Sequence, residues 1–124
     1  MPVLRKTLNL TLSGNTLFPV NESGQPDHDA GVQGENGAVA LRFALPADWQ
    51  DLSVNLYATA QDGAFDVASD ADGAVTLELP GVLLAAPGRL FVHAEGTDGV
   101  NTRKTEDCVF RIHPGAQGVR PVSA

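Results

Sequence analysis

The sequence offers almost nothing from which a disulfide framework, an export signal or a membrane anchor could be built. Only one of its 124 residues is a cysteine, Cys108, so an internal disulfide is excluded and packing alone must hold the fold, even in a reducing cytoplasm. No apolar run approaches the roughly 20 residues needed to span a bilayer. The amino terminus alternates Leu with Asn and Thr and lacks the continuous apolar centre of a secretory signal. We therefore expect a soluble protein, made in the cytoplasm without a signal peptide.

Basic residues are also scarce. The chain has 8 Lys and Arg against 15 Asp and Glu, which gives a net charge of −7 and an isoelectric point near 4.6. Nucleic acids and anionic membrane surfaces attract clustered positive charge, which this composition does not supply. We expect neither a nucleic acid nor a membrane as a partner.

Long stretches at helical spacing are missing as well. Thirteen glycines and eight prolines divide the chain into short pieces, and its length suits one domain with one core. The only helix candidate is the short segment "PGVLLAAPG" at 80–88. We interpret it as a connecting loop or a single turn.

What the chain does contain is a repeated alternation of apolar and polar residues, the period of a half-buried strand. Six segments show it, each with one apolar face. Their inward positions are Leu8, Leu10 and Leu12; Val39, Leu41, Phe43 and Leu45; Leu52, Val54, Leu56 and Ala58; Val75, Leu77 and Leu79; Leu90, Val92 and Ala94; and Cys108, Phe110 and Ile112. A weaker seventh candidate at 65–68 lies between two Asp-Gly turns, and we predict it at a sheet edge.

Short half-buried strands separated by turn residues are typical of two sheets packed face to face. We predict an all-β fold: a single immunoglobulin-like antiparallel β-sandwich of about seven strands, without a disulfide. The sandwich would span residues 1–113 and include a long exposed loop at 21–37, where apolar residues are almost absent. Residues 114–124 would form an extended tail.

Metal-binding patterns are weak. With Asp70 and Asp72 at positions three and five of an EF-hand loop, Leu79 falls where the bidentate Glu should be. The neighbouring residues 27–29, Asp-His-Asp, point apart in an extended chain, whereas a closed site needs converging ligands. We expect structural turns and no metal or cofactor, with a loosely built calcium site of another geometry as the alternative.

Catalytic patterns are weak too, so we do not expect an enzyme. No serine lies in a nucleophile elbow, and His93 and His113 have no patterned Ser or Cys partner. Cys108 has the inward parity of a small core residue. Trp49 is interpreted as capping one end of the core, and its alternative role is a stacking platform for a sugar.

The outward positions point to an interaction surface. In an immunoglobulin-like layout the third, sixth and seventh strands share a sheet. Tyr57, Phe91 and Val109 would then form an apolar centre, with His93 and Arg111 at its polar rim, a composition that suits a protein interface. Scattered exposed apolar residues are also ordinary on any sheet, so both interpretations stay open.

Three segments carry a resemblance to a known family. They read "GENGAVALRFALPADWQDLSVNLY" at 34–57, "DGAVTLELPGVLLAAPGRLFVHAEG" at 72–96 and "TRKTEDCVFRI" at 102–112. Together they resemble the small β-sandwich domains that open the upper baseplate and tail-fibre-type proteins of siphophages infecting Gram-positive hosts. The resemblance covers roughly residues 8–113.

The resemblance implies a non-enzymatic structural component of a bacteriophage virion, either attached to the baseplate or tail or decorating the capsid. Its partners would be other virion proteins and copies of itself in a symmetric assembly. The face around Phe91 and the two termini would carry the contacts, with the acidic turns at 62–73 left to solvent. The alternative is a free-standing carbohydrate- or host-surface-binding module that uses Trp49, Tyr57 and the loop at 21–37.

Overall fold

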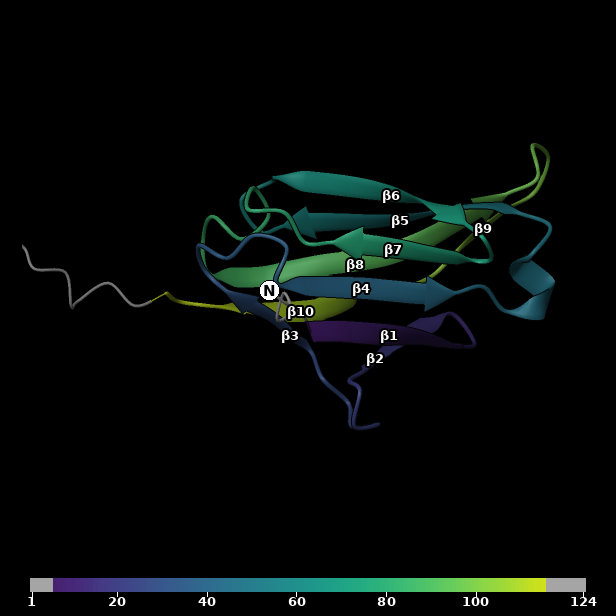
Figure 1. Ribbon diagram of the computed structural model, residues 1–124. Helices are drawn as coiled ribbons and strands as arrows, with labels where there is room; N and C mark the ends of the chain where they lie inside the picture. The colour runs from purple at the N-terminus through teal and green to yellow at the C-terminus, as the bar shows by residue number, and fades with distance from the viewer. Residues whose placement is uncertain (1–5, 116–124) are drawn as a thin grey trace, which may run out of the picture.

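The computed structural model describes residues 6–115 and shows ten β-strands and one short 3-10 helix (Figure 1). The elements are β1 (Lys6–Ser13), β2 (Thr16–Val20), β3 (Asp29–Val32), β4 (Val39–Ala44), η1 (Ala47–Trp49), β5 (Ser53–Ala60), β6 (Phe65–Ala71), β7 (Ala74–Glu78), β8 (Gly88–Thr97), β9 (Thr102–Lys104) and β10 (Cys108–His113). The predicted all-β class is confirmed. Most of the predicted tail, and the terminal residues expected to contact other chains, lie outside the described range.

The strands form one curled sheet in the order β2-β1-β4-β7-β6-β5-β8-β10-β3, and β9 pairs with β8 off this path. The curl depends on β6. Its residues 65–69 pair with β5, whereas residues 70–71 pair with β7, so this strand belongs to both halves of the sheet. Figure 1 shows the strands aligned along one direction and wrapped around a shared interior.

This architecture corrects the prediction of a seven-strand antiparallel sandwich. The described residues form ten strands, and two neighbouring pairs are parallel, β1 with β4 and β10 with β3. Instead of two separate sheets, a continuous sheet curls into a half-barrel. The seventh candidate strand was also misplaced, because β6 lies between β7 and β5 and not at an edge.

The predicted core is confirmed, because period two puts every second side chain on the inner side of the curl. Nearly all the inward residues named above are buried, and the largest are the rings of Phe43 and Phe110. Leu12 and Leu52 are half-buried and pack against this core from its margins.

Three strands, β2, β3 and β9, escaped prediction because each has only five residues or fewer, too few to show a clear period. β2 contributes the buried Leu17, and β3 lies inside the segment predicted as an exposed loop. Ala30 and Gly31 of β3 are buried against β10, so part of the 21–37 segment belongs to the sheet. Four residues with a single valine, "DAGV", give no visible period in the sequence.

The segment predicted as a loop or single turn at 80–88 forms successive tight turns that lead into β8. The Leu83 and Leu84 amides donate hydrogen bonds to the carbonyls of Pro80 and Gly81, at 3.0 and 3.1 Å. Both leucine side chains are fully buried. This connection therefore closes part of the core instead of crossing its surface.

Candidate interaction surface

The five predicted interface residues lie on one face of the sheet. Tyr57 belongs to β5, Phe91 and His93 to β8, and Val109 and Arg111 to β10, three strands that are adjacent in the order given above. In the register, Tyr57 stands opposite His93 and Phe91 stands opposite Val109. Directly opposed residues share a face, so period two and sheet adjacency together bring these side chains side by side.

The apolar part of this face extends further than the sequence indicated. Thr59 of β5 pairs with Phe91 on one side and with Phe65 of β6 on the other. We call Phe65, Thr59, Phe91 and Val109, which cross four neighbouring strands, the apolar row. Phe65 is 68% exposed and Val109 is 43% exposed. Sequence reasoning missed Phe65 because it placed β6 at an edge of the sheet.

A second row runs beside the apolar row and becomes polar toward β10. Val67 of β6 stands opposite Tyr57, whose ring stacks on His93 with the ring centroids 5.1 Å apart. The Nε2 atom of His93 lies 2.8 Å from a carboxylate oxygen of Glu95, and Nδ1 lies 3.6 Å from one of Asp107. The imidazole is thus held between two acids at the rim of the apolar row.

Trp49 does not provide a stacking platform. It is only 2% exposed and meets the edge of Phe43, with ring centroids 5.7 Å apart and planes at 85°. Arg103 covers the ring, with its guanidinium carbon 5.2 Å from the ring centroid. The core interpretation of Trp49 therefore holds, and the sugar-stacking alternative is wrong because neither ring face is open.

Two aspartates of the acidic turns at 62–73, one of them the EF-hand candidate Asp70, accept hydrogen bonds from the backbone. Asp70 accepts a hydrogen bond from the Val54 amide at 3.0 Å, and Asp62 accepts one from the Ala64 amide at 3.1 Å. Within residues 6–115, no group of three or more His, Cys, Asp and Glu side chains is arranged to hold a metal ion. The same residues contain no helix that is long and apolar enough to cross a membrane.

The only cysteine is expected to be unreactive at neutral pH. Cys108 lies on the inner side of β10, and burial raises the pKa of its thiol to about 11. Thiolate is the nucleophilic form, and very little of it exists at neutral pH with such a pKa. This side chain fills the core, as its parity predicted.

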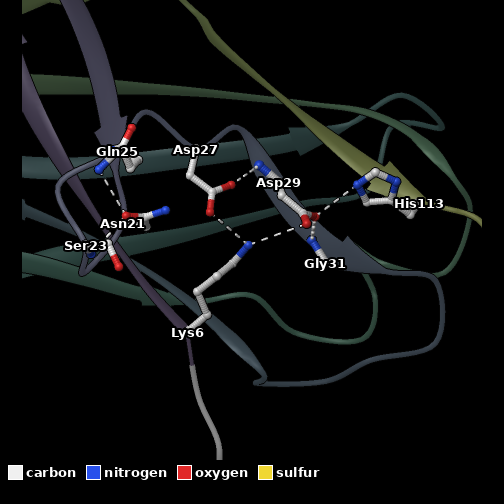
Figure 2. A network of polar contacts seen from close by, with 8 residues as sticks. All are labelled: Lys6, Asn21, Ser23, Gln25, Asp27, Asp29, Gly31 and His113. Atoms are coloured by element: carbon white, nitrogen blue, oxygen red, sulfur yellow. Dashed lines mark hydrogen bonds and ion pairs between the residues drawn. The ribbon is translucent and has the colours of Figure 1, made fainter.

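The Asp-His-Asp segment at 27–29 does not converge on one point. Asp27 and Asp29 both face Lys6 of β1, with oxygens 3.4 and 3.6 Å from its Nζ atom (Figure 2). His28 turns toward β10, where its Nδ1 atom lies 3.1 Å from the Val109 carbonyl oxygen. Asp29 also reaches His113 at 3.2 Å, so this network ties β1, β3 and β10 together.

The network predicts a pH dependence of stability. Partial burial opposes the charge of Asp27, but the Asp29 amide and the Lys6 ammonium overcome it and hold the pKa of Asp27 below its usual value. A carboxyl group with a depressed pKa stabilises the fold above its unfolded pKa, about 3.9, and loses this contribution as the pH falls further. We expect Asp27→Asn to lower the free energy of unfolding by about 1 kcal/mol at pH 7 and by less at pH 3.

Urea denaturation at the two pH values measures this difference. Asp72→Asn is the matched control, because Asp72 is an exposed turn residue and the substitution removes the same charge. An equal loss at pH 7 and pH 3 for Asp27→Asn, or an equal effect of both variants, would contradict the role assigned to the Lys6 contact.

No protein-family model and no curated protein matches this chain. The similarity to baseplate and tail-fibre-type proteins therefore rests on the three sequence segments alone and stays a prediction.

Proposed function

We propose that this chain is a non-enzymatic structural component of a bacteriophage virion that docks through the apolar row. The observation that carries a docking function is the row itself: exposed Phe65 and Val109 at its ends, with Thr59 and the half-buried Phe91 between them. Of the seven large apolar residues exposed in the described chain, three lie on this face: Phe65, Val67 and Val109. The assignment to a virion is proposed from the sequence resemblance alone.

Energetics favour this face as a contact. Burying apolar surface contributes about 25 cal/mol for each Å², and sheet strands already hold these side chains in fixed positions. The acids beside His93 supply a polar rim, which is the usual arrangement around an apolar interface centre. Of the predicted immunoglobulin-like layout, the proposal needs only the adjacency of β5, β8 and β10.

Partners and location follow from the same proposal. The chain would contact other virion proteins and further copies of itself, after synthesis in the host cytoplasm. We do not propose the free-standing carbohydrate-binding module, because Trp49 is buried and the ring of Tyr57 is stacked on His93.

The test is incorporation into particles. We expect Phe91→Asp and Phe65→Asp proteins to keep the circular dichroism spectrum of the parent protein while their copy number in purified phage particles falls at least tenfold, a loss of about 1.4 kcal/mol or more. Phe18→Asp is the matched control, because Phe18 is 48% exposed but lies on β2, away from the apolar row.

Quantitative mass spectrometry against the major capsid protein gives the copy number. Normal incorporation of folded Phe91→Asp and Phe65→Asp proteins, or an equal loss with Phe18→Asp, would show that the apolar row is not the docking surface. Absence of the parent chain from purified particles would refute the proposal that it is a virion component.

A further inference from the structure

A cleft of about 400 Å³ opens beside the apolar row, where β8 begins and β10 ends. Its size is within the range of ligand-binding sites. Its charged and polar lining comes from Arg89, Arg111, His28 and Gln61, and its apolar lining includes Val109 and Pro87. No Asp or Glu lines it, although acids outnumber basic residues 15 to 8 in the whole sequence.

The two arginines form an unfavourable pair. Arg111 stands directly opposite Arg89 in the β10–β8 register, and like charges in this position destabilise a sheet. Neither guanidinium has a carboxylate within ion-pair distance among residues 6–115. In contrast, the cationic side chains of Lys6, Arg103 and Lys104 each lie within 4 Å of an Asp or Glu oxygen.

The neighbouring contacts hold the walls of the cleft in place. The Gln61 side-chain oxygen accepts a hydrogen bond from the Arg89 amide at 3.0 Å, and a Cβ atom on Gly88 would lie only 2.7 Å from that oxygen. On the other side, the Arg111 amide donates to the His28 carbonyl at 2.8 Å. The backbone beneath both arginines is therefore fixed, while both side chains are exposed and Arg111 forms no ion pair with Asp29, its register partner on β3.

We propose that this cleft binds a carboxylate side chain from an acidic segment of the partner protein. Guanidinium groups match the planar carboxylate with paired hydrogen bonds, and the apolar wall suits the methylene groups or an apolar neighbour of the acidic residue. The inference rests on the proposed function, because Val109 belongs both to the apolar row and to the cleft. An acid seated between Arg89 and Arg111 would also relieve their repulsion.

A blocked peptide, acetyl-Leu-Glu-Leu-Glu-Leu-amide with a fluorescent label, tests the cleft by fluorescence anisotropy on the full chain. We expect saturable binding that weakens at least tenfold when Gln replaces Glu in the peptide, and at least tenfold in Arg89→Gln and Arg111→Gln proteins. Arg42→Gln is the matched control, because Arg42 also lacks a carboxylate partner in the described chain but lies on β4, outside the cleft. Its affinity should change less than twofold.

Stability provides a second readout, because the arginine pair costs stability when empty. Thermal melting of Arg89→Gln and Arg111→Gln proteins should occur at or above the temperature of the parent protein, although both have lost affinity. Equal binding of the Gln peptide, or an equal loss with Arg42→Gln, would overturn the proposal. If inorganic phosphate displaces the peptide at a lower concentration than acetate does, the proposal of a carboxylate ligand would be overturned and a phosphate site indicated.

The same assay separates this inference from the proposed function. Peptide binding by Phe65→Asp protein, which is expected to be lost from particles and carries its substitution on β6, separated from β8 by β5, should stay within twofold of the parent. If the parent protein binds the peptide but substitutions in the apolar row do not affect incorporation, the proposed function is refuted and the proposal for the cleft is not. If the apolar-row variants lose incorporation as expected but the parent protein does not bind the peptide, only the proposal for the cleft is refuted.

Discussion

Replacing Phe110 with alanine is expected to lower the free energy of unfolding by about 3 to 5 kcal/mol. The ring is 1% exposed and lies on the inner side of β10, between β8 and β3. Its removal forfeits the transfer of the ring from water and leaves a cavity that the surrounding strands cannot close. Such a loss is a large fraction of the total stability of a small domain.

Phe65→Ala is the control for this experiment, because the same side chain is deleted on the outer side of the sheet. We expect its cost to stay below about 1 kcal/mol, as for most surface substitutions. Chemical denaturation of both variants gives the two values. A cost below about 1 kcal/mol for Phe110→Ala, or equal costs for the two, would mean that the assignment of inner and outer faces is wrong.

The second large effect is expected outside the strands. Leu83→Ala should lower the free energy of unfolding by about 2 to 5 kcal/mol, the range for a buried leucine in a strand or helix. Leu83 is fully buried although it belongs to a turn, because the connection at 80–87 folds its leucines inward. Surface loops in general tolerate substitution well, so this cost would be unusual for a connection.

Val82→Ala provides the neighbouring comparison, because Val82 lies in the same turns with its side chain exposed. We expect a change within about 0.5 kcal/mol there. Similar midpoints of denaturation for Leu83→Ala, Val82→Ala and the parent protein would show that the turns do not close the core.

The inner face of the sheet was predictable because its signal is local. β1 alternates Leu with polar residues, and β4 alternates Val, Leu and Phe with Ala and Arg, so the burial of the large side chains follows directly from that period. β3 has four residues and two of them are Ala and Gly, so its burial depends on a partner strand, β10, that the local sequence does not reveal. The parallel pairing of β1 with β4 was equally unpredictable, because β2 and β3 lie between these two strands in the sequence.

The candidate surface was predictable to the extent that its strands were. Tyr57, Phe91 and Val109 come from strands with clear alternation, and their shared face follows from parity. Phe65 joins them only because the first part of β6 pairs with β5 before the strand crosses to β7, which is a property of the curled sheet. The pairing of Arg89 with Arg111 depends on the register of two strands about twenty residues apart, and no local pattern sets it.

The parallel pairing of β3 with β10 has a consequence for how the chain folds. Asp29 and Arg111 are register partners although most of the chain separates them in sequence. β3 therefore has no sheet partner until β10 has been synthesised. Contacts of such sequence separation slow folding, because loop closure must precede the gain from pairing. During synthesis β8 also waits for β10 with an open edge, and unpaired edges promote aggregation. A ribosome-bound chain that ends before Cys108 should therefore be captured by chaperones, and its release should coincide with the emergence of the last strand.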